Sequence, residues 1–196
     1  MRSTSECWHV IESWLAANGV DDVLAEPAPD ADIAAVEETV DVTLPESFCT
    51  FLQTHNGQTP DSRPLLRRFG LYSTSAIISE WKRMTDLLRD GTFEGRLDDF
   101  DERFGRPGPE VRDVWWNDQW IPFARDAGGN LLCIDLDPSP AGSQGQIIVV
   151  WHDMPTRPVR ASSFAEWFQG YATAIEEGEL VYSERTHSMM SNSEEH

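Results

Sequence analysis

The sequence predicts an α+β domain in which helices pack against a mostly antiparallel sheet. Apolar residues at helical spacing fill the first half of the chain, short strand-like runs separated by turn residues follow, and one more helical pattern comes last. The chain has 196 residues and is 40% apolar, which suits one domain with a substantial core. We expect this domain to cover residues 4–178 and the polar stretch 179–196 to form a disordered tail.

Four amphipathic helices are predicted ahead of most of the sheet. Each carries apolar residues three and four positions apart, and they cover about residues 4–17, 30–40, 45–55 and 75–89. In the third helix Pro45 is expected in the first turn, where its missing N–H costs nothing. Asn56 and Gly57 end that helix, because glycine takes the left-handed conformation needed just past a helix end.

Short runs of β-branched and aromatic residues predict the sheet. The strands are expected at about residues 69–72, 119–125, 130–137 and 145–152. The Asp-Ala-Gly-Gly sequence at 126–129 is typical of a turn between the second and third strands. Ser163, with Glu166 three residues later, predicts the start of the final helix through a capping box. Residues 91–113 are polar and irregular, which indicates a mobile or family-specific insertion.

The charge balance restricts the classes of partner. Fifteen basic residues face 34 acidic ones, for a formal net charge of -19. Nucleic acids and anionic membranes are bound through basic surface, so we expect this chain to bind neither. A strongly acidic surface attracts basic proteins and accelerates their capture. Solubility is an equally simple explanation of the same negative charge, and it needs no binding partner.

The cysteines and the absence of long apolar runs indicate a cytoplasmic protein. Cys7, Cys49 and Cys133 are far apart and odd in number, with no Cys-x-x-Cys pair, so they are expected to be reduced thiols. No run approaches the roughly 18 apolar residues of a membrane span. The N-terminus lacks the apolar core and cleavage site of a signal peptide.

Asp126, Asn130, Asp135 and Asp137 are the candidates for a metal site. Carboxylates in this number suit Mg²⁺, Mn²⁺ or Ca²⁺, and Asp135 and Asp137 project from one face of a strand. The spacing of a calcium-binding loop is missing, as is a glycine-rich phosphate loop. Since acidic residues are common at turns and strand ends, we favour a sheet with no metal and no cofactor.

Catalysis would need His55, His152 or Cys133. Cys133 lies between apolar residues in a predicted strand, where a thiol is buried and inert. His55 ends a helix, where a histidine interacts favourably with the helix dipole. No nucleophile-elbow motif is present, so we expect no enzymatic activity.

Three tryptophans precede or begin the second strand. Trp120 is expected in the core. Trp115 and Trp116 point in opposite directions if the chain is extended there, so one of them is expected to be exposed. Tryptophan is enriched at the centres of protein interfaces, which makes Trp116 a candidate contact residue.

Three motifs give the chain a resemblance to the SMI1/KNR4 family, which is also called the SUKH superfamily. They are EETVDVTLP through HNG at 37–57, WIPFARD through GQ at 120–146, and SFxxWFxxY at 163–171. The resemblance covers most of the chain, roughly residues 8–178. Many members have glycine where this chain has Asp41, and aspartate tolerates the left-handed conformation better than most residues. Residues 91–118 match nothing in the family pattern.

The resemblance implies an α+β fold without catalysis. Bacterial members are commonly immunity proteins that bind and block toxins, often nucleases, whereas fungal relatives are interaction proteins in cell-wall synthesis and signalling. The leading hypothesis is an immunity protein that captures a basic cognate toxin. The alternative is a regulatory interaction module, and the third possibility is a metal-dependent enzyme. The expected contact residues are acidic apart from one tryptophan: Asp98, Asp99, Asp101, Glu102, Asp135, Asp137 and Trp116.

Overall fold

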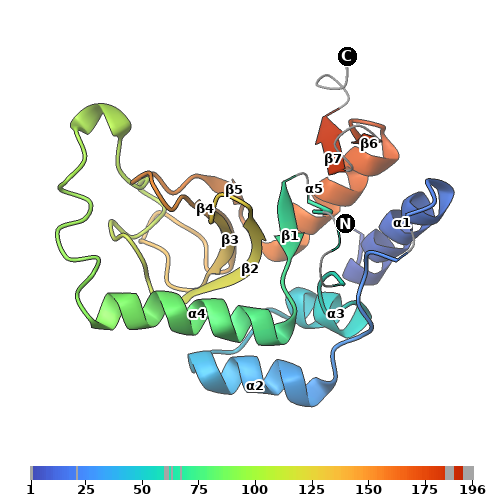
Figure 1. The fold of residues 1–196 in the computed structure, drawn as a ribbon, viewed down its shortest axis with the longest axis horizontal. Helices are drawn as coiled ribbons and strands as arrows, with labels where there is room; N and C mark the ends of the chain where they lie inside the picture. Colours follow the sequence, from blue (N-terminus) through green and yellow to red (C-terminus); the bar gives the residue numbers. More distant parts are fainter. Residues whose placement is uncertain are drawn as a thin grey trace.

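The computed structural model describes residues 2–20, 22–59, 62, 64–66, 68–183 and 188–191 (Figure 1). Over these residues the chain forms five α-helices, one short 3-10 helix and seven strands. The helices are α1 (Thr4–Ala17), α2 (Asp30–Val40), α3 (Glu46–Thr54), α4 (Thr74–Arg89), η1 (Glu102–Phe104) and α5 (Phe164–Glu176). The strands are β1 (Phe69–Leu71), β2 (Trp120–Asp126), β3 (Leu131–Asp135), β4 (Gln146–Val150), β5 (Val159–Ala161), β6 (Leu180–Ser183) and β7 (Ser188–Ser191).

The main sheet confirms the predicted α+β class. Its five strands follow the order β1-β2-β3-β4-β5, and every neighbouring pair is antiparallel. Helix α4 runs along one side of the sheet with α2 packed beyond it, while α1, α3 and α5 contact one another (Figure 1). Strands β6 and β7 form a separate two-stranded sheet.

Strands β2, β3 and β4 are buried on both faces of the sheet. An aromatic cluster covers one face: the Phe123 ring lies 6.0 Å from that of Phe48 and 5.6 Å from that of Phe164. On the face that carries Trp120, the ring of Trp116 makes an edge contact at 5.8 Å. The segment 91–118 therefore covers part of this second face. Because both faces are buried, these strands have continuous apolar runs instead of alternating apolar and polar residues.

The structure confirms most of the residues that were predicted to start or end the helices. Helix α1 has the predicted bounds, and Gly57 has a φ of +77°. A Cβ atom on Gly57 would lie 2.5 Å from the Tyr72 carbonyl carbon, so close backbone approach also requires glycine there. Pro45 occupies the N-cap of α3 rather than its first turn. Asp41 has φ 59° and ψ 51°, the left-handed conformation that was expected at this position.

Three strands differ from the sequence prediction. Strand β5 has only three residues and follows two prolines, Pro155 and Pro158, so no alternating pattern marked it. Strands β6 and β7 pair antiparallel inside the expected tail, whereas residues 184–187 and 192–196 lie outside the described residues. Within the described part of the chain, none of the helices combines the length and apolar content needed to cross a membrane.

Candidate functional site

A shallow hollow of 280 Å³ lies where the end of α4 meets the segment 91–118. Its apolar lining includes Leu88, Phe93 and Val114, of which Leu88 and Val114 are exposed. The other lining residues are Glu94, Gly95, Arg96, Leu97, Asp98, Arg106, Asp113, Trp115 and Trp116. Leu88, Val114 and the nearby Phe104 are three of the four large exposed hydrophobic residues in the described part of the chain. We name the lining residues of this hollow, with Asp99, Glu102 and Phe104, the 88–116 surface.

Trp115 is the centre of the stack that supports this surface. The ring of Phe100 lies 5.5 Å from the Trp115 ring and nearly parallel to it. The guanidinium carbons of Arg96 and Arg157 lie 5.0 Å and 4.9 Å from the centre of the same ring. Cation–π contacts of this kind stabilise most when the cation is desolvated, as it is at Arg157.

Arg157 is a buried cation that donates hydrogen bonds to backbone carbonyl groups. Its side chain is 1% exposed, and its Nη atoms donate to the carbonyl oxygens of Met154, Thr156 and Trp115 at 2.6, 2.8 and 2.7 Å. Its Nε has no hydrogen-bond partner among the described residues. Burial lowers the pKa of Arg157 to about 10. Sequence reasoning missed this residue, since no local motif marks an arginine that bonds a carbonyl 42 positions away.

Arg106 bridges two aspartates at the rim of the hollow. It donates from Nε and Nη2 to the two carboxylate oxygens of Asp113 at 3.1 and 2.9 Å, and from Nη1 to Asp98 at 3.0 Å. All three side chains are largely exposed. Hydrogen bonds from Arg106, first to Asp113 and then to Asp98, raise the pKa of the guanidinium. An exposed bridge of this kind shapes a loop more than it stabilises the fold.

The four predicted acidic residues of the segment 91–118 are all exposed. Asp98 is engaged by Arg106, and Asp101 caps η1 by accepting from the Arg103 N–H at 3.0 Å. Asp99 and Glu102 make no side-chain hydrogen bond or ion pair with any described residue. Of the predicted acidic set, these two are therefore the carboxylates most available to an external partner.

Trp116 and Asp135 lie inside the protein, which corrects their expected place on a contact surface. Trp116 is 1% exposed and its Nε1 donates to the Thr85 hydroxyl at 3.4 Å. Asp135 is 0% exposed and accepts hydrogen bonds from Trp120 Nε1, the Asp137 N–H and Gln146 Nε2. Burial raises the pKa of the Asp135 carboxyl. Trp116 is buried because it packs against Trp120 and α4, and Asp135 is buried because the segment 91–118, of which Trp116 and Glu110 are part, covers that face of the sheet.

Asp137 is half-buried and held within the fold. It accepts from Arg112 Nη2 at 2.7 Å and from Asn117 Nδ2 at 3.0 Å. The hydrogen bond from Asn117, together with Arg112, lowers the pKa of the Asp137 carboxyl. Asp137 therefore fastens the end of the segment 91–118 to the end of β3.

The four metal-site candidates do not meet in one place. Trp120 at the start of β2 pairs with Asp135, so Asp126 at the end of β2 lies at the opposite end of the sheet from Asp135. Asp126 accepts from the Asn130 N–H and Nδ2, both at 2.9 Å, and forms an ion pair with Arg68 at 3.2 Å. No group of three His, Cys, Asp or Glu side chains in the described residues is arranged to hold a metal ion.

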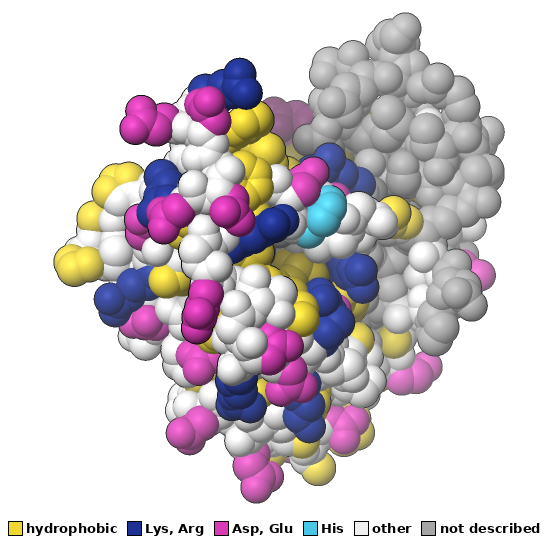
Figure 2. All heavy atoms as spheres, turned by 60° about the vertical axis from the view of Figure 1, so that its left-hand side comes forward, with side chains coloured by type: hydrophobic (Ala, Val, Ile, Leu, Met, Phe, Trp, Pro, Cys, Tyr) yellow, Lys and Arg dark blue, Asp and Glu magenta, His cyan; other side chains and the backbone are white. Residues whose placement is uncertain are grey.

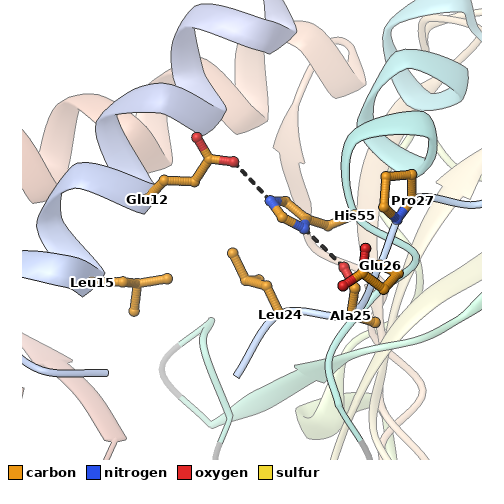
Figure 3. Close-up of a pocket in the computed structure, with 7 residues that line it drawn as sticks. All are labelled: Glu12, Leu15, Leu24, Ala25, Glu26, Pro27 and His55. Carbon is orange, nitrogen blue, oxygen red and sulfur yellow. Dashed lines mark hydrogen bonds and ion pairs between the residues drawn. The ribbon is translucent and has the colours of Figure 1, made fainter. Parts of the chain in front are cut away.

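A second hollow, also of 280 Å³, contains a close pairing of a carboxylate with the candidate catalytic residue His55 (Figure 3). His55 Nε2 lies 2.8 Å from Glu12 Oε1, and His55 Nδ1 lies 2.8 Å from the Ala25 carbonyl oxygen. Both partner atoms are acceptors, so the ring donates to both only when both nitrogens carry hydrogen. The remaining lining residues are Leu15, Leu24, Glu26 and Pro27. Among the described residues, no serine, threonine, cysteine or lysine lines this hollow.

The other two catalytic candidates lie apart from His55. Cys133 is fully buried in β3, and burial raises the pKa of its thiol well above the ordinary range. His152 follows β4 and faces Asn130, with His152 Nδ1 3.2 Å from Asn130 Oδ1. The described contacts therefore assemble no pair of nucleophile and base from these residues.

Charges of both signs are interspersed on the side of the molecule that carries the segment 91–118. Figure 2 brings this side forward and shows Asp and Glu next to Lys and Arg, with apolar side chains visible between them. The net charge of -19 thus does not gather into one uniform acidic patch on this face.

The structure defines an α+β domain with a five-stranded antiparallel sheet and two shallow surface hollows. The chain belongs to the SMI1/KNR4 family (SUKH-1), whose family model matches residues 27–170. The resemblance seen in the sequence motifs is therefore confirmed.

Curated relatives come from several fungi. The chain is 31% identical to the cell wall biosynthesis/cell cycle regulator smi1 of Schizosaccharomyces pombe, over 94% of this chain and 38% of that protein. It is 25% identical to the glucan synthesis regulatory protein of Neurospora crassa, over 93% of this chain and 40% of the relative. It is 24% identical to the cell wall assembly regulator SMI1 of Saccharomyces cerevisiae, over 87% and 40% respectively. The chain thus spans about two fifths of the length of these relatives, which are named as regulators.

Proposed function

We propose that this chain is a non-catalytic protein-binding domain that acts in the regulation of cell-wall assembly. The observation that carries the proposal is membership of the SMI1/KNR4 family together with the names of its curated relatives. The 88–116 surface is the part of the domain that suits binding. It places exposed Leu88, Phe104 and Val114 among charged side chains, and an apolar centre with a polar rim is typical of protein interfaces.

The chemistry of the two hollows supports a binding role rather than catalysis. An acyl- or phosphoryl-transfer site needs a nucleophile beside a base, or a metal. Glu12 and His55 form a pair, and none of the described residues that line their hollow is a serine, threonine, cysteine or lysine. The 88–116 surface contains Arg106, which is paired with two aspartates, and Arg96, which lies over aromatic rings, and its residues include no histidine, cysteine or serine.

The regulatory alternative now has more support than the immunity hypothesis. The relatives reported above are fungal proteins named for cell-wall and glucan regulation. Capture of a basic toxin is supported by the net charge of -19, and that charge is equally compatible with any basic protein partner.

A domain replacement in a relative tests this function. The matching part of the S. pombe regulator, which is 31% identical, would be exchanged for this chain in cells that lack their own copy. We expect the chimera to restore growth on a glucan-binding dye. Rescue should be lost with Val114→Asp and kept with Val159→Asp, a matched control of 37% exposure against 38% that lies outside the hollow. A chimera that accumulates as folded protein without rescue overturns the proposal.

A further inference from the structure

We infer that the hollow of the 88–116 surface seats a basic segment of a partner protein, with one large apolar side chain in the hollow and Lys or Arg on either side of it. This inference rests on the proposed function and names the chemistry of the partner. It is argued from the lining of the hollow, its unpaired carboxylates and its rigid support.

The apolar lining sets the anchor of the bound segment. Leu88, Phe93 and Val114 present hydrocarbon to a space of 280 Å³. This volume lies at the lower end of the range for small-molecule pockets, about 300 to 1,000 Å³, and it has room for one large inserted side chain. Large apolar side chains in such pockets supply most of the binding free energy of an interface.

The carboxylates around the hollow determine which charge the flanking residues of the partner segment should carry. Glu94 lines the hollow, exposed Asp99 follows the lining residue Asp98, and exposed Glu102 begins η1. None of the three makes a side-chain hydrogen bond or ion pair with a described residue. In contrast, Arg106 is already paired with Asp98 and Asp113. Arg96 also lines the hollow without a carboxylate partner among the described residues, and its guanidinium lies over the Phe100 and Trp115 rings. Three unpaired carboxylates thus outnumber one unpaired cation, so the charge offered to a partner is predominantly negative and complementary to Lys and Arg.

The hollow is supported by groups that are already ordered. Trp116 is hydrogen-bonded to Thr85 of α4, and Trp115 is fixed by the buried Arg157. A lining that is rigid before binding loses little conformational entropy when a partner docks, which favours affinity. A second copy of this chain is a poor occupant, since both copies would carry a charge of -19.

Titration of the ¹⁵N-labelled chain with three synthetic peptides tests the inference by NMR. The first peptide carries a single Trp flanked by Arg and Lys, the second has Ser in place of that Trp, and the third has Glu in place of each basic residue. We expect saturable amide shifts in residues 88–116 with the first peptide alone, and weaker binding at higher salt. No saturable shift with the first peptide overturns the inference. Shifts centred on Glu12 and His55, or equal binding of the acidic peptide, overturn it as well.

Single substitutions locate the contact. Val114→Asp should weaken binding of the first peptide about tenfold, the scale of an anchoring residue. Glu94→Lys and Glu102→Lys should each weaken it severalfold, and Val159→Asp should leave it unchanged. Equal affinities of wild type and Val114→Asp would overturn the assignment of the hollow. Peptide binding without rescue by the chimera removes the cell-wall role alone, whereas rescue without peptide binding removes this inference alone.

Discussion

The Arg157 Nη2 donates to the carbonyl oxygen of Trp115 at 2.7 Å, and the guanidinium of Arg157 lies 4.9 Å from the centre of the Trp115 ring. One buried side chain thus fixes both the backbone and the ring of the same residue. Because Trp115 lines the hollow, this contact connects the 88–116 surface to the segment that leads into β5.

Of two substitutions at Arg157, the chemically less similar one, Arg157→Met, should destabilise the fold less than Arg157→Lys. Arg157→Lys keeps a buried cation but loses the planar fork that reaches three carbonyl groups, so we expect a loss of about 2 kcal/mol or more in the free energy of unfolding. Arg157→Met removes the same bonds together with the burial penalty, and the lowering of the guanidinium pKa to about 10 puts that penalty at about 3 kcal/mol. Urea unfolding should therefore find Arg157→Met the more stable of the two variants. A more stable Arg157→Lys would contradict this account.

The two aspartates of the Asp-Leu-Asp sequence should differ in their effect on stability. Asp135→Ala removes the shared acceptor of three donors, those of Trp120, Gln146 and the Asp137 backbone, of which Gln146 Nε2 keeps only its bond to the Glu110 carbonyl oxygen. We expect a loss of about 3 kcal/mol. Asp137→Ala removes a solvent-accessible pair with Arg112 and the hydrogen bond from Asn117, for which about 1 kcal/mol is expected. Thermal unfolding of both variants checks this difference, and equal losses would show that Asp135 has no special structural role.

The pH dependence of stability should carry the signature of Asp135. Burial raises the pKa of this carboxyl in the folded state above its ordinary value of 3.8, so the folded protein binds a proton more readily than the unfolded chain does. The free-energy cost of burying the charged carboxylate is complete above the raised pKa. Protonation removes this cost as the pH falls toward 3.8. The stability of wild type relative to Asp135→Asn should therefore rise as the pH falls from 7 to about 4. A difference that stays constant over this range would contradict the burial-raised pKa.

Two left-handed positions should respond in opposite directions to substitution. Gly57→Ala adds a Cβ atom 2.5 Å from the Tyr72 carbonyl carbon at a φ of +77°, so a loss of about 3 kcal/mol is expected. Asp41→Gly relieves the left-handed conformation at a φ of 59°, where Asp41 makes no side-chain hydrogen bond with a described residue, and should stabilise the fold by up to about 1 kcal/mol. Differential scanning calorimetry of the two variants measures both shifts, and a lower Tm for Asp41→Gly would show that its side chain contributes.

The regular elements were largely predictable because their signals are local. The apolar stripe of α1 and the glycine after α3 are read within a few residues, and the structure has both where they were expected. Strands β2, β3 and β4 were predicted to within a few residues for the same reason. Strand β5 was missed because three exposed or half-buried residues form it only through pairing with β4.

The sequence by itself determined the fold class, the family and the order of the elements, since periodicity, capping and turn residues act over short distances. Only the tertiary structure decided which functional candidates are accessible. Trp116 and Asp135 became core residues when the segment 91–118 covered the second face of the sheet. Arg157 acquired its role from a carbonyl 42 positions away. Burial and long-range hydrogen bonds depend on contacts between residues that are far apart in the sequence. No local pattern in this sequence encodes those contacts.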